Sequence, residues 1–232
     1  MLLESLAATA AIAIENARLY EQAQRDMQAK SVLLHEVNHR VKNNLSAIIG
    51  VLYAERQREE VTSEAAYRAV MQDLISRVQG LATAHRLLSS ADWAPVRLSD
   101  LAARVIHSCL QTMPKRKPVS VDVAPSEIRV TPDQAHQIAL VINELATNTI
   151  KHGLTVSGTA RISVAIGLQN HTVHLEFRDN GPGYPPEVLS CERASVGFDL
   201  IRSVATEGLR GHLSLRNEAG AVTSIRFKSL VN

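Results

Sequence analysis

Aromatic residues, cysteines and an excess of charge of one sign are all scarce in this chain of 232 residues. Phe, Trp and Tyr make up 3% of the sequence, too few for the stacking platforms that hold single-stranded nucleic acid. Lys and Arg number 25 and Asp and Glu 23, so the formal net charge is only +2. That balance provides no basic surface for nucleic acid or an anionic membrane, and we expect no nucleic acid among the partners.

Cysteine pairs and long apolar runs are also missing. Cys109 and Cys191 are far apart in the sequence, which predicts buried apolar side chains rather than a disulfide framework or a zinc site. No apolar run approaches the roughly 18 residues that span a bilayer. The apolar opening, residues 1–13, has no basic region before it and includes Glu4, unlike a secretion signal. We therefore expect a cytoplasmic protein without direct membrane insertion.

The first part of the chain has the periodicity of helices. Apolar residues recur at spacings of three and four from Leu6 to Leu52, without a proline, which predicts a long coiled-coil helix that leads into a bundle. After a polar gap at 55–63, a second stripe consists of Tyr67, Val70, Met71, Leu74, Val78, Leu81, His85 and Leu88. Two such helices predict an antiparallel hairpin, and two hairpins pair as a dimeric four-helix bundle.

After Pro95 the pattern changes to mixed strands and helices. Thr131-Pro132-Asp133-Gln134 is a strong helix start, with Thr as the N-cap and Pro in the first position, and Gly153 marks the end of that helix. Another helix is expected at 99–110, strands at 119–123, 162–168 and 173–177, a helix at 198–206, and two final strands. This order predicts an α/β sandwich of the α+β class.

A first polar cluster surrounds His39. If the apolar stripe faces the bundle, His39 lies on the opposite side of its helix together with Asn43, and Glu36 flanks it. An acid can orient an imidazole, and nearby cations can hold a phosphate. The alternative is an ordinary charged helix surface.

Two further clusters follow in the second half. Glu144, Asn148 and Lys151 fall on one helical face, and a carboxylate, an amide and an ammonium suit a magnesium–phosphate site. Asp179-Asn180-Gly181-Pro182-Gly183 follows a strand, and its glycines let backbone approach a ligand. Near Gly197 a helix begins whose N-terminal amides could receive phosphate. Taken singly, these are also ordinary polar faces and turns. The sequence has no G-x-x-x-x-G-K phosphate loop.

In their order and spacing, these motifs closely resemble those of sensor histidine kinases, in particular the HRxKNNL (HisKA_2-like) group with an ATP-binding domain of the GHKL or Bergerat type. The quoted strings are HRVKNNL from His39, RVQGLATAHRL from Arg77, NELATNTIKHG from Asn143 and DNGPG from Asp179. The resemblance implies three parts: a signalling coiled coil at 1–29, a dimerisation and phosphotransfer hairpin at 30–95, and a catalytic ATP-binding domain at 96–232. Residues 1–29 are similar to the tail of a GAF-like sensor domain, whose remainder is missing from this chain.

The resemblance also implies an activity and a role for each site residue. ATP would autophosphorylate His39, and the phosphoryl group would pass to an aspartate in the receiver domain of a response regulator. By motif position, Asn148 would coordinate Mg²⁺, Lys151 would contact phosphate and Asp179 would accept a hydrogen bond from the adenine amino group. The other nucleotide-site candidates are Glu144, as a magnesium or water-network residue, His152, with a helix-end cation as its alternative, Gly181 and Gly183, which would shape the pocket, and Gly197, in the loop that would close over the phosphates.

The sequence departs from the family pattern in places. Arg40 follows His39 where many relatives have an acid, so we expect Glu36 to orient His39 and Asn43 to position water for dephosphorylation of the regulator. Only one glycine, Gly197, stands in the last glycine box. This leaves open a phosphotransfer or scaffold protein with a degenerate ATP-binding domain. A third alternative is an enzyme of the same fold that hydrolyses ATP or phosphorylates serine, which the HRVKNNL string argues against.

Overall fold

The structure, a computed structural model, describes residues 14–25, 27, 64–111, 118–153, 159–190 and 196–231. The chain divides into two compact units, Met1–Ala47 and Ile48–Asn232. In the first unit residues 14–25 form an exposed helix, in agreement with the helix expected there, and the coiled coil stays a prediction. The candidates His39, Glu36 and Asn43 lie outside the described residues, and so does the first helix of the predicted hairpin.

The second unit is built on a five-stranded sheet in the order β2-β4-β5-β7-β6. Edge strand β2 (Val119–Val123) runs parallel to β4 (Ala160–Gln169), and the remaining pairs, through β5 (Thr172–Asp179), β7 (Ala221–Lys228) and β6 (His212–Asn217), are antiparallel. Asn170 and His171 join β4 to β5 with φ of 49° and 59°, values typical of a tight hairpin turn. Two short strands, β1 (Val96–Arg97) and β3 (Arg129–Val130), form a separate small sheet.

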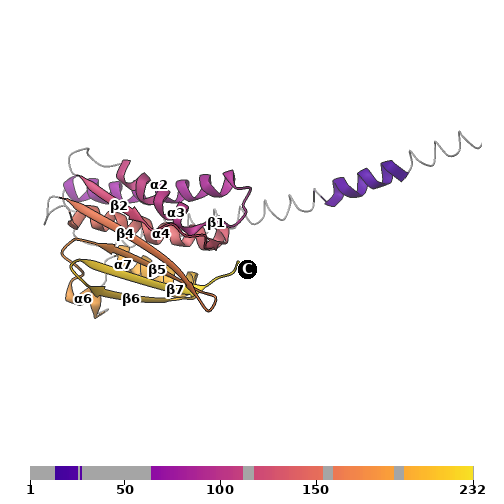
Figure 1. The fold of residues 1–232 in the computed structure, drawn as a ribbon. Coiled ribbons are helices and arrows are strands. Elements are labelled where there is room, and N and C mark those ends of the chain that lie inside the picture. Colours follow the sequence, from indigo (N-terminus) through magenta and orange to yellow (C-terminus); the bar gives the residue numbers. More distant parts are fainter. Residues whose placement is uncertain are drawn as a thin grey trace, which may run out of the picture. The chain divides into compact units, whose positions relative to one another are not determined.

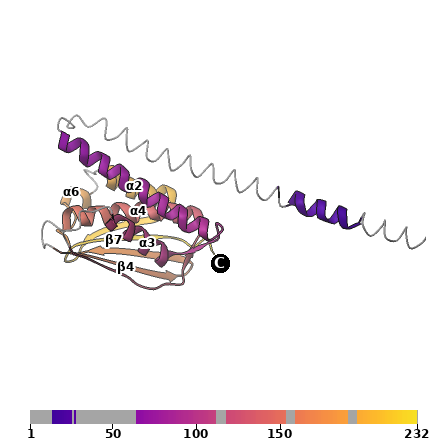
Figure 2. The ribbon, with the colours of Figure 1, turned by 90° about the horizontal axis from the view of Figure 1, so that it is seen from above.

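Helices lie on one face of this sheet (Figure 1). Next to the sheet are α3 (Leu98–Gln111), α4 (Pro132–Asn148) and α7 (Val196–Ser203), and α2 (Glu64–Ser90) packs on α3 and α4. Figure 2 shows α2 and α4 side by side from above. The shorter helical elements are α6 (Pro186–Leu189) and two π-helical turns, η1 (Thr149–Gly153) and η2 (Val204–Gly208). Within the described ranges, no helix has the length and apolar character required to cross a membrane.

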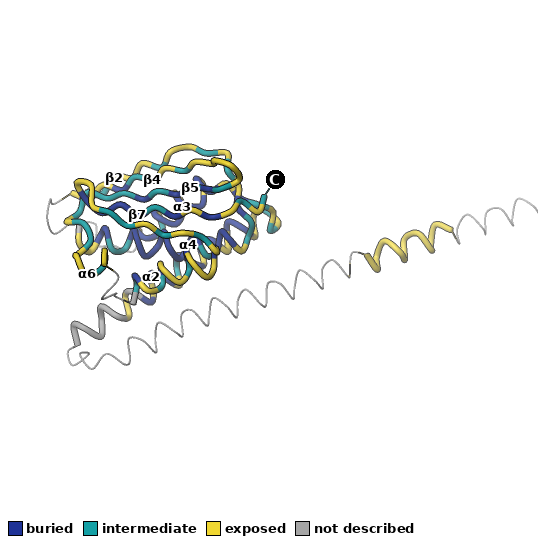
Figure 3. Tube along the Cα trace, turned by 90° about the horizontal axis from the view of Figure 1, so that it is seen from below, coloured by how far each residue is buried: buried dark blue, intermediate teal, exposed yellow. Residues whose placement is uncertain are grey.

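The hydrophobic core fills the space between the sheet and the helices. Buried positions concentrate on the inner sides of the strands and on the helices that face them (Figure 3). The largest fully buried side chains come from both layers: Leu98, Leu101, Ile106, Ile138, Ile142, Ile162, Ile201, Ile225 and Phe227. Alternation along β5 places Val173, Leu175 and Phe177 in this core and leaves the intervening side chains on the outer face.

The predicted start of α4 is confirmed in detail. The Thr131 hydroxyl accepts a hydrogen bond from the Gln134 backbone N–H at 3.3 Å, and the Gln134 side chain accepts one from the Thr131 N–H at 3.3 Å. This capping box fixes where the helix begins. Because an α-helix repeats every 3.6 residues, this starting point also determines which side chains near the C-terminal end of α4 face the loops at the end of the sheet.

Helix α2 buries only part of the apolar stripe predicted for it. Leu74, Leu81 and Leu88 are buried as expected, but Val78 is 47% exposed. His85, for which the sequence favoured a hairpin core position, is exposed, and its ring lies edge-on to Trp93 at 5.2 Å. The first helix of that hairpin lies outside the described residues, so this prediction stays untested. The described part of α2 packs toward α4, and Gly80 lies so close to that helix that a Cβ there would be 2.6 Å from the Asn143 Oδ1.

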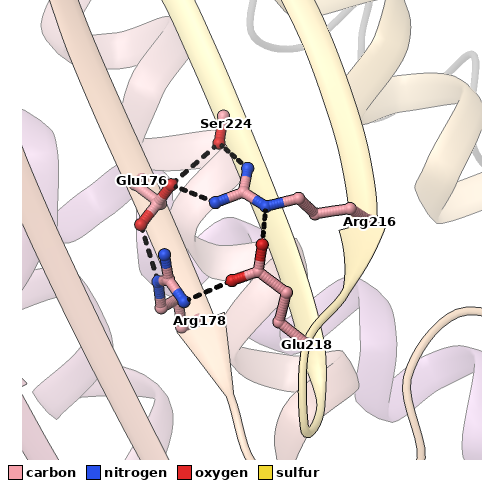
Figure 4. A network of polar contacts seen from close by, with 5 residues as sticks. All are labelled: Glu176, Arg178, Arg216, Glu218 and Ser224. Atoms are coloured by element: carbon pink, nitrogen blue, oxygen red, sulfur yellow. Dashed lines mark hydrogen bonds and ion pairs between the residues drawn. The ribbon is translucent and has the colours of Figure 1, made fainter.

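The outer face of the sheet carries a closed ring of charges (Figure 4). Glu176 binds the Arg178 Nε at 2.6 Å and the Arg216 Nη2 at 2.7 Å, and Glu218 binds the Arg216 Nε at 2.6 Å and the Arg178 Nη1 at 2.8 Å. The Ser224 hydroxyl donates to Glu176 at 3.2 Å. Two carboxylates and two guanidinium groups balance one another, so this ring ties β5, β6 and β7 together without a net charge.

Candidate functional site

A cavity of about 280 Å³ opens beside the end of β5. It lies among the end of α4, the turn η1, the loop after β5, the start of α7 and the start of β7. Four of the sequence-predicted residues line it together: Asn148, His152, Asp179 and Gly183. The remaining lining residues were not predicted: Pro182, Tyr184, Pro185, Val188, Phe198 and Ala221.

Asp179 is held in a fixed orientation at the end of β5. Its Oδ1 accepts hydrogen bonds from the backbone N–H groups of Gly181 at 2.8 Å and Ala221 at 3.0 Å. Its Oδ2 accepts one from the Thr149 hydroxyl at 2.9 Å. A carboxylate oxygen has two lone pairs, so Oδ2 keeps one acceptor position for a ligand in the cavity.

The glycine loop after Asp179 is fastened to β6 through Asn217. The Asn217 side chain accepts from the Tyr184 N–H at 2.8 Å and donates to the Tyr184 carbonyl at 3.0 Å. Gly183 has a φ of +83°, and a Cβ there would be 2.7 Å from the Asn217 Cγ. Both the conformation and the close approach require glycine at 183. Gly183 lines the cavity, whereas Gly181 is not among the lining residues and donates its N–H to Asp179, so its predicted role in shaping the pocket stays a prediction.

Two aromatic rings form the apolar part of the cavity. Tyr184 and Phe198 have ring centroids 6.5 Å apart, at an angle of 57°. The Tyr184 hydroxyl forms a short hydrogen bond with the Thr223 hydroxyl on β7. Burial, with a further contribution from the negative charge of Asp179, raises the pKa of Tyr184 to about 12, so the phenol is neutral at physiological pH. The site therefore joins an aromatic, apolar wall to a polar end, which suits a heteroaromatic base.

The polar face predicted on α4 divides between two environments. Asn148 lines the cavity. Glu144 instead faces α2, where the Arg77 Nε and Nη2 bind its two carboxylate oxygens at 2.5 and 3.0 Å. Asn143 accepts from the Cys109 thiol at 2.9 Å, and burial raises the pKa of that thiol to about 11. Glu144 thus forms an ion pair with Arg77 that was not predicted from the sequence. Its proposed role in a magnesium or water network stays a prediction.

Lys151 and His152 lie in η1, directly after α4. Both side chains are exposed, and His152 lines the cavity. Lys151 is the neighbour of His152 in the same turn but is not among the lining residues of the cavity. Its contact with phosphate stays a prediction. Gly197 lies in the first turn of α7, against Glu144. Residues 191–195, which precede that turn, are outside the described part of the chain.

The described residues do not form a metal centre by themselves. Among them, no group of three or more His, Cys, Asp and Glu side chains could hold a metal ion. Magnesium that arrives with a nucleotide takes most of its ligands from phosphate and water and needs only one or two from the protein. Asn148 lines the cavity, and an amide side chain carries an oxygen of the kind that such a site requires.

The second unit is a mixed sheet covered by helices on one face, with a cavity at the end of a central strand. The fold is similar to that of a blue-light-activated histidine kinase from Erythrobacter litoralis, with a TM-score of 0.64, 19% identity and coverage of 84% of this chain and 58% of that one. Residues 36–121 match the family described as HWE histidine kinase, and residues 133–231 match the family of histidine kinase-, DNA gyrase B- and HSP90-like ATPases. Both matched regions therefore identify the chain as similar to histidine kinases.

Curated relatives agree with this identification. The sensor histidine kinase PdtaS of Mycobacterium tuberculosis is 27% identical over 211 residues, which are 90% of this chain and 41% of the relative. A blue-light-activated histidine kinase of Rhizobium johnstonii is 25% identical over 200 residues, 85% of this chain and 53% of the relative. The chain thus spans about half the length of these proteins.

Proposed function

We propose that the chain is the core of a sensor histidine kinase, which uses ATP to phosphorylate His39 and then transfers the phosphoryl group to an aspartate of a response-regulator receiver domain. The observation that carries this proposal is the cavity at Asp179, where a fixed carboxylate with one remaining acceptor lies beside an aromatic wall. Both matched families are kinase-associated, which disfavours a scaffold with a degenerate ATP-binding domain.

We assign the chain more finely to the HRxKNNL, HisKA_2-like group. The HRVKNNL string falls inside residues 36–121, the range that matches the HWE histidine kinases. In this assignment His39 is the phosphoacceptor, Glu36 orients its ring and Asn43 positions water for the reverse, dephosphorylating reaction. The segments 1–29, 30–95 and 96–232 then serve as signalling coiled coil, phosphotransfer hairpin and catalytic domain.

The chemistry we propose is phosphoryl transfer by positioning. A ring nitrogen of His39 forms a bond to the γ-phosphorus of ATP while the bond from that phosphorus to the β,γ-bridging oxygen breaks, and ADP leaves. Mg²⁺, when bound with ATP, neutralises phosphate charge. Asn148 would hold this ion, and Lys151 and His152 would add positive or donor groups near the phosphates. The protein contributes orientation and charge neutralisation rather than a covalent bond from the ATP domain.

The polar end of the cavity favours adenine over guanine. Asp179 Oδ2 can accept from an exocyclic amino group. Tyr184 and Thr223 have two hydroxyl protons between them, but their mutual hydrogen bond uses only one. The second proton is available for a ring nitrogen that accepts. Adenine presents an amino donor beside such a nitrogen, whereas guanine presents a carbonyl beside an N–H.

The partners follow from the same assignment. We propose a response-regulator receiver domain as the phosphoryl acceptor, a homodimer formed through the helical hairpin, and a sensor domain joined to residues 1–29. The relatives extend well beyond the region matched here, which leaves room in a complete protein for such a domain.

Labelling with γ-radiolabelled ATP tests the function. The purified chain is incubated with Mg²⁺ and the labelled nucleotide beside His39→Gln, with His35→Gln as a matched control four residues earlier. We expect label that survives alkali, is lost in acid and is absent only from the His39 variant. Label that persists in His39→Gln, or that is stable to acid, would contradict this assignment.

A further inference from the structure

The ion pair between Arg77 and Glu144 joins α2 to α4 just behind the cavity. The guanidinium and carboxylate form two hydrogen bonds, at 2.5 and 3.0 Å, and the two residues are only 5% and 4% exposed. A buried charge that loses its partner is strongly destabilising, so each of these groups depends on the other. Glu144 is one helical turn before Asn148, which lines the cavity. The pair therefore lies one turn of α4 away from the candidate nucleotide site.

Gly197, in the first turn of α7, rests directly on this ion pair. A Cβ at 197 would be 2.7 Å from the Glu144 Oε2 and 3.6 Å from the Arg77 Nη2. Its φ is outside the left-handed region, so the close approach rather than backbone conformation requires glycine. The carboxylate that Arg77 holds in place is thus the surface on which α7 begins.

The next residue, Phe198, belongs to the cavity. Its side chain is buried, lines the cavity and contacts the ring of Tyr184. Two adjacent residues of α7 therefore have different neighbours: Gly197 contacts the ion pair between α2 and α4, and Phe198 forms part of the cavity wall. Because the two are consecutive in one helical turn, a shift of the ion pair moves the aromatic wall.

We propose that Arg77 is a positioning residue of the nucleotide site, which acts through Glu144 and Gly197 on Phe198 and thereby couples the docking of α2 to nucleotide binding. The inference rests on the proposed function, since the ligand is Mg-ATP. Coupling of this kind is reciprocal: if docked α2 strengthens nucleotide binding, nucleotide strengthens the docking of α2 by the same factor. Residue 77 lies in the predicted phosphotransfer hairpin, 30–95, so the coupling joins the second helix of that hairpin to the ATP site.

The test measures Mg-ATP affinity by calorimetry on the full chain and its variants. Arg77→Met and Gly197→Ala should each weaken binding by about 5- to 10-fold. Gly197→Ala retains both charges, so it tests the same contact without an unpaired buried group. Arg86→Met removes a guanidinium from the exposed side of the same helix and should leave the affinity unchanged. Combined, Arg77→Met and Gly197→Ala should weaken binding by less than the product of their separate effects, because they act through one contact.

Amide hydrogen exchange distinguishes coupling from a purely structural role of Arg77, because only coupling predicts that Mg-ATP changes the exchange rates in α2. Mg-ATP should slow amide exchange in α2 residues 74–90 of the wild-type chain, and this protection should be lost in Gly197→Ala. If the wild-type chain binds Mg-ATP but Arg77→Met and Gly197→Ala bind it equally well, the coupling is overturned while the proposed function stands. If the wild-type chain does not bind Mg-ATP, the proposed function is overturned and this inference with it.

Discussion

The Tyr184 phenol, from the glycine loop that lines the cavity, forms a hydrogen bond with the Thr223 hydroxyl on β7. Thr223 is almost completely buried, and Tyr184 keeps its proton because its pKa is raised to about 12. The cavity is thus lined by a neutral phenol and by the carboxylate of Asp179. In our proposal, these two groups of opposite hydrogen-bonding character select the base.

Removal of the Tyr184 hydroxyl should weaken adenine binding selectively. In Tyr184→Phe the aromatic wall remains, but one neutral hydrogen bond is lost, which predicts a decrease in ATP affinity of about 3- to 10-fold. Affinity for GTP should change little, because guanine offers no acceptor at that position. Titration calorimetry with both nucleotides measures the ratio, with Tyr20→Phe as a control on the exposed helix of the first unit. An equal loss for both nucleotides would contradict a role in base selection.

Asp179→Asn should reverse the hydrogen-bonding character of the carboxylate. The retained oxygen is expected to stay on the backbone N–H groups of Gly181 and Ala221, so the new amide NH₂ replaces Oδ2. Two donors would then face each other when adenine binds, and ATP affinity should fall by about 100-fold or more. The ratio of ATP affinity to GTP affinity should decrease at the same time. Asp122→Asn on edge strand β2 is the matched control, and an unchanged ratio would count against the assignment of Asp179.

Gly183→Ala should destabilise the domain. The residue has a φ of +83°, and its Cβ would be 2.7 Å from the Asn217 side chain, so strain of about 1–3 kcal/mol is expected. Thermal unfolding measures the loss. Gly167→Ala provides the control, because a Cβ there meets nothing within 4 Å. Asn217→Ala removes the close contact but also two hydrogen bonds to Tyr184, so it serves as the reference for the double variant. Against that reference, Gly183→Ala should cost less stability than in the wild type, because the positive φ remains but the close contact does not. No cost at all would mean that backbone conformation contributes nothing.

The charge ring on the outer face of the sheet should make stability fall in acid. Partial burial pushes the pKa of Glu176 upward, but hydrogen bonds from Arg216 and Arg178 outweigh this, and the pKa lies below the ordinary 4.5. Hydrogen bonds from Arg216 and Arg178 also lower the pKa of Glu218. Groups with lowered folded-state pKa values stabilise the protein above their unfolded pKa, and this contribution is lost as the pH falls through the folded values.

Denaturant titrations between pH 7 and pH 3 measure this effect. Arg216→Gln removes the principal partner of both carboxylates, so its stability should depend less on pH in the acid range than that of the wild type. The exposed Arg226→Gln on β7 is the control and should follow the wild-type curve. Parallel curves for wild type and Arg216→Gln below pH 4.5 would show that the ring does not set the acid dependence.

Local sequence patterns, such as capping residues and alternating apolar positions, were sufficient to predict most of the longer helices and strands of the second unit. Thr131 and Gln134 mark a helix start because capping depends on residues three apart, and alternation marks β5 because the core lies on one side of it. The same local logic placed Asn148 and Asp179 at the ends of elements that meet. The two-residue β1 and β3 strands and the four-residue α6 are too short to produce a periodic signal.

Contacts between distant positions could not be read from the sequence. Arg77 and Glu144 are 67 positions apart, and Tyr184 and Asn217 are 33 apart. Each residue alone is compatible with an exposed surface, and only the packing of α2 on α4, or of the glycine loop on β6, brings its partner near. Tyr184 and Phe198 were missed as cavity residues for the same reason. The exposure of Val78 and His85 likewise depends on which side of α2 meets α4.

The close approach of Gly80 to Asn143 restricts how α2 can move. Only a residue without a side chain fits at that crossing. If α2 turned about its own axis or slid by one position, Gln79 or Leu81 would come opposite Asn143 and collide with it. Lifting α2 off α4 meets no such obstacle. The contact at Gly80 therefore hinders rotation and sliding of α2 along α4, but it does not hinder separation of the two helices.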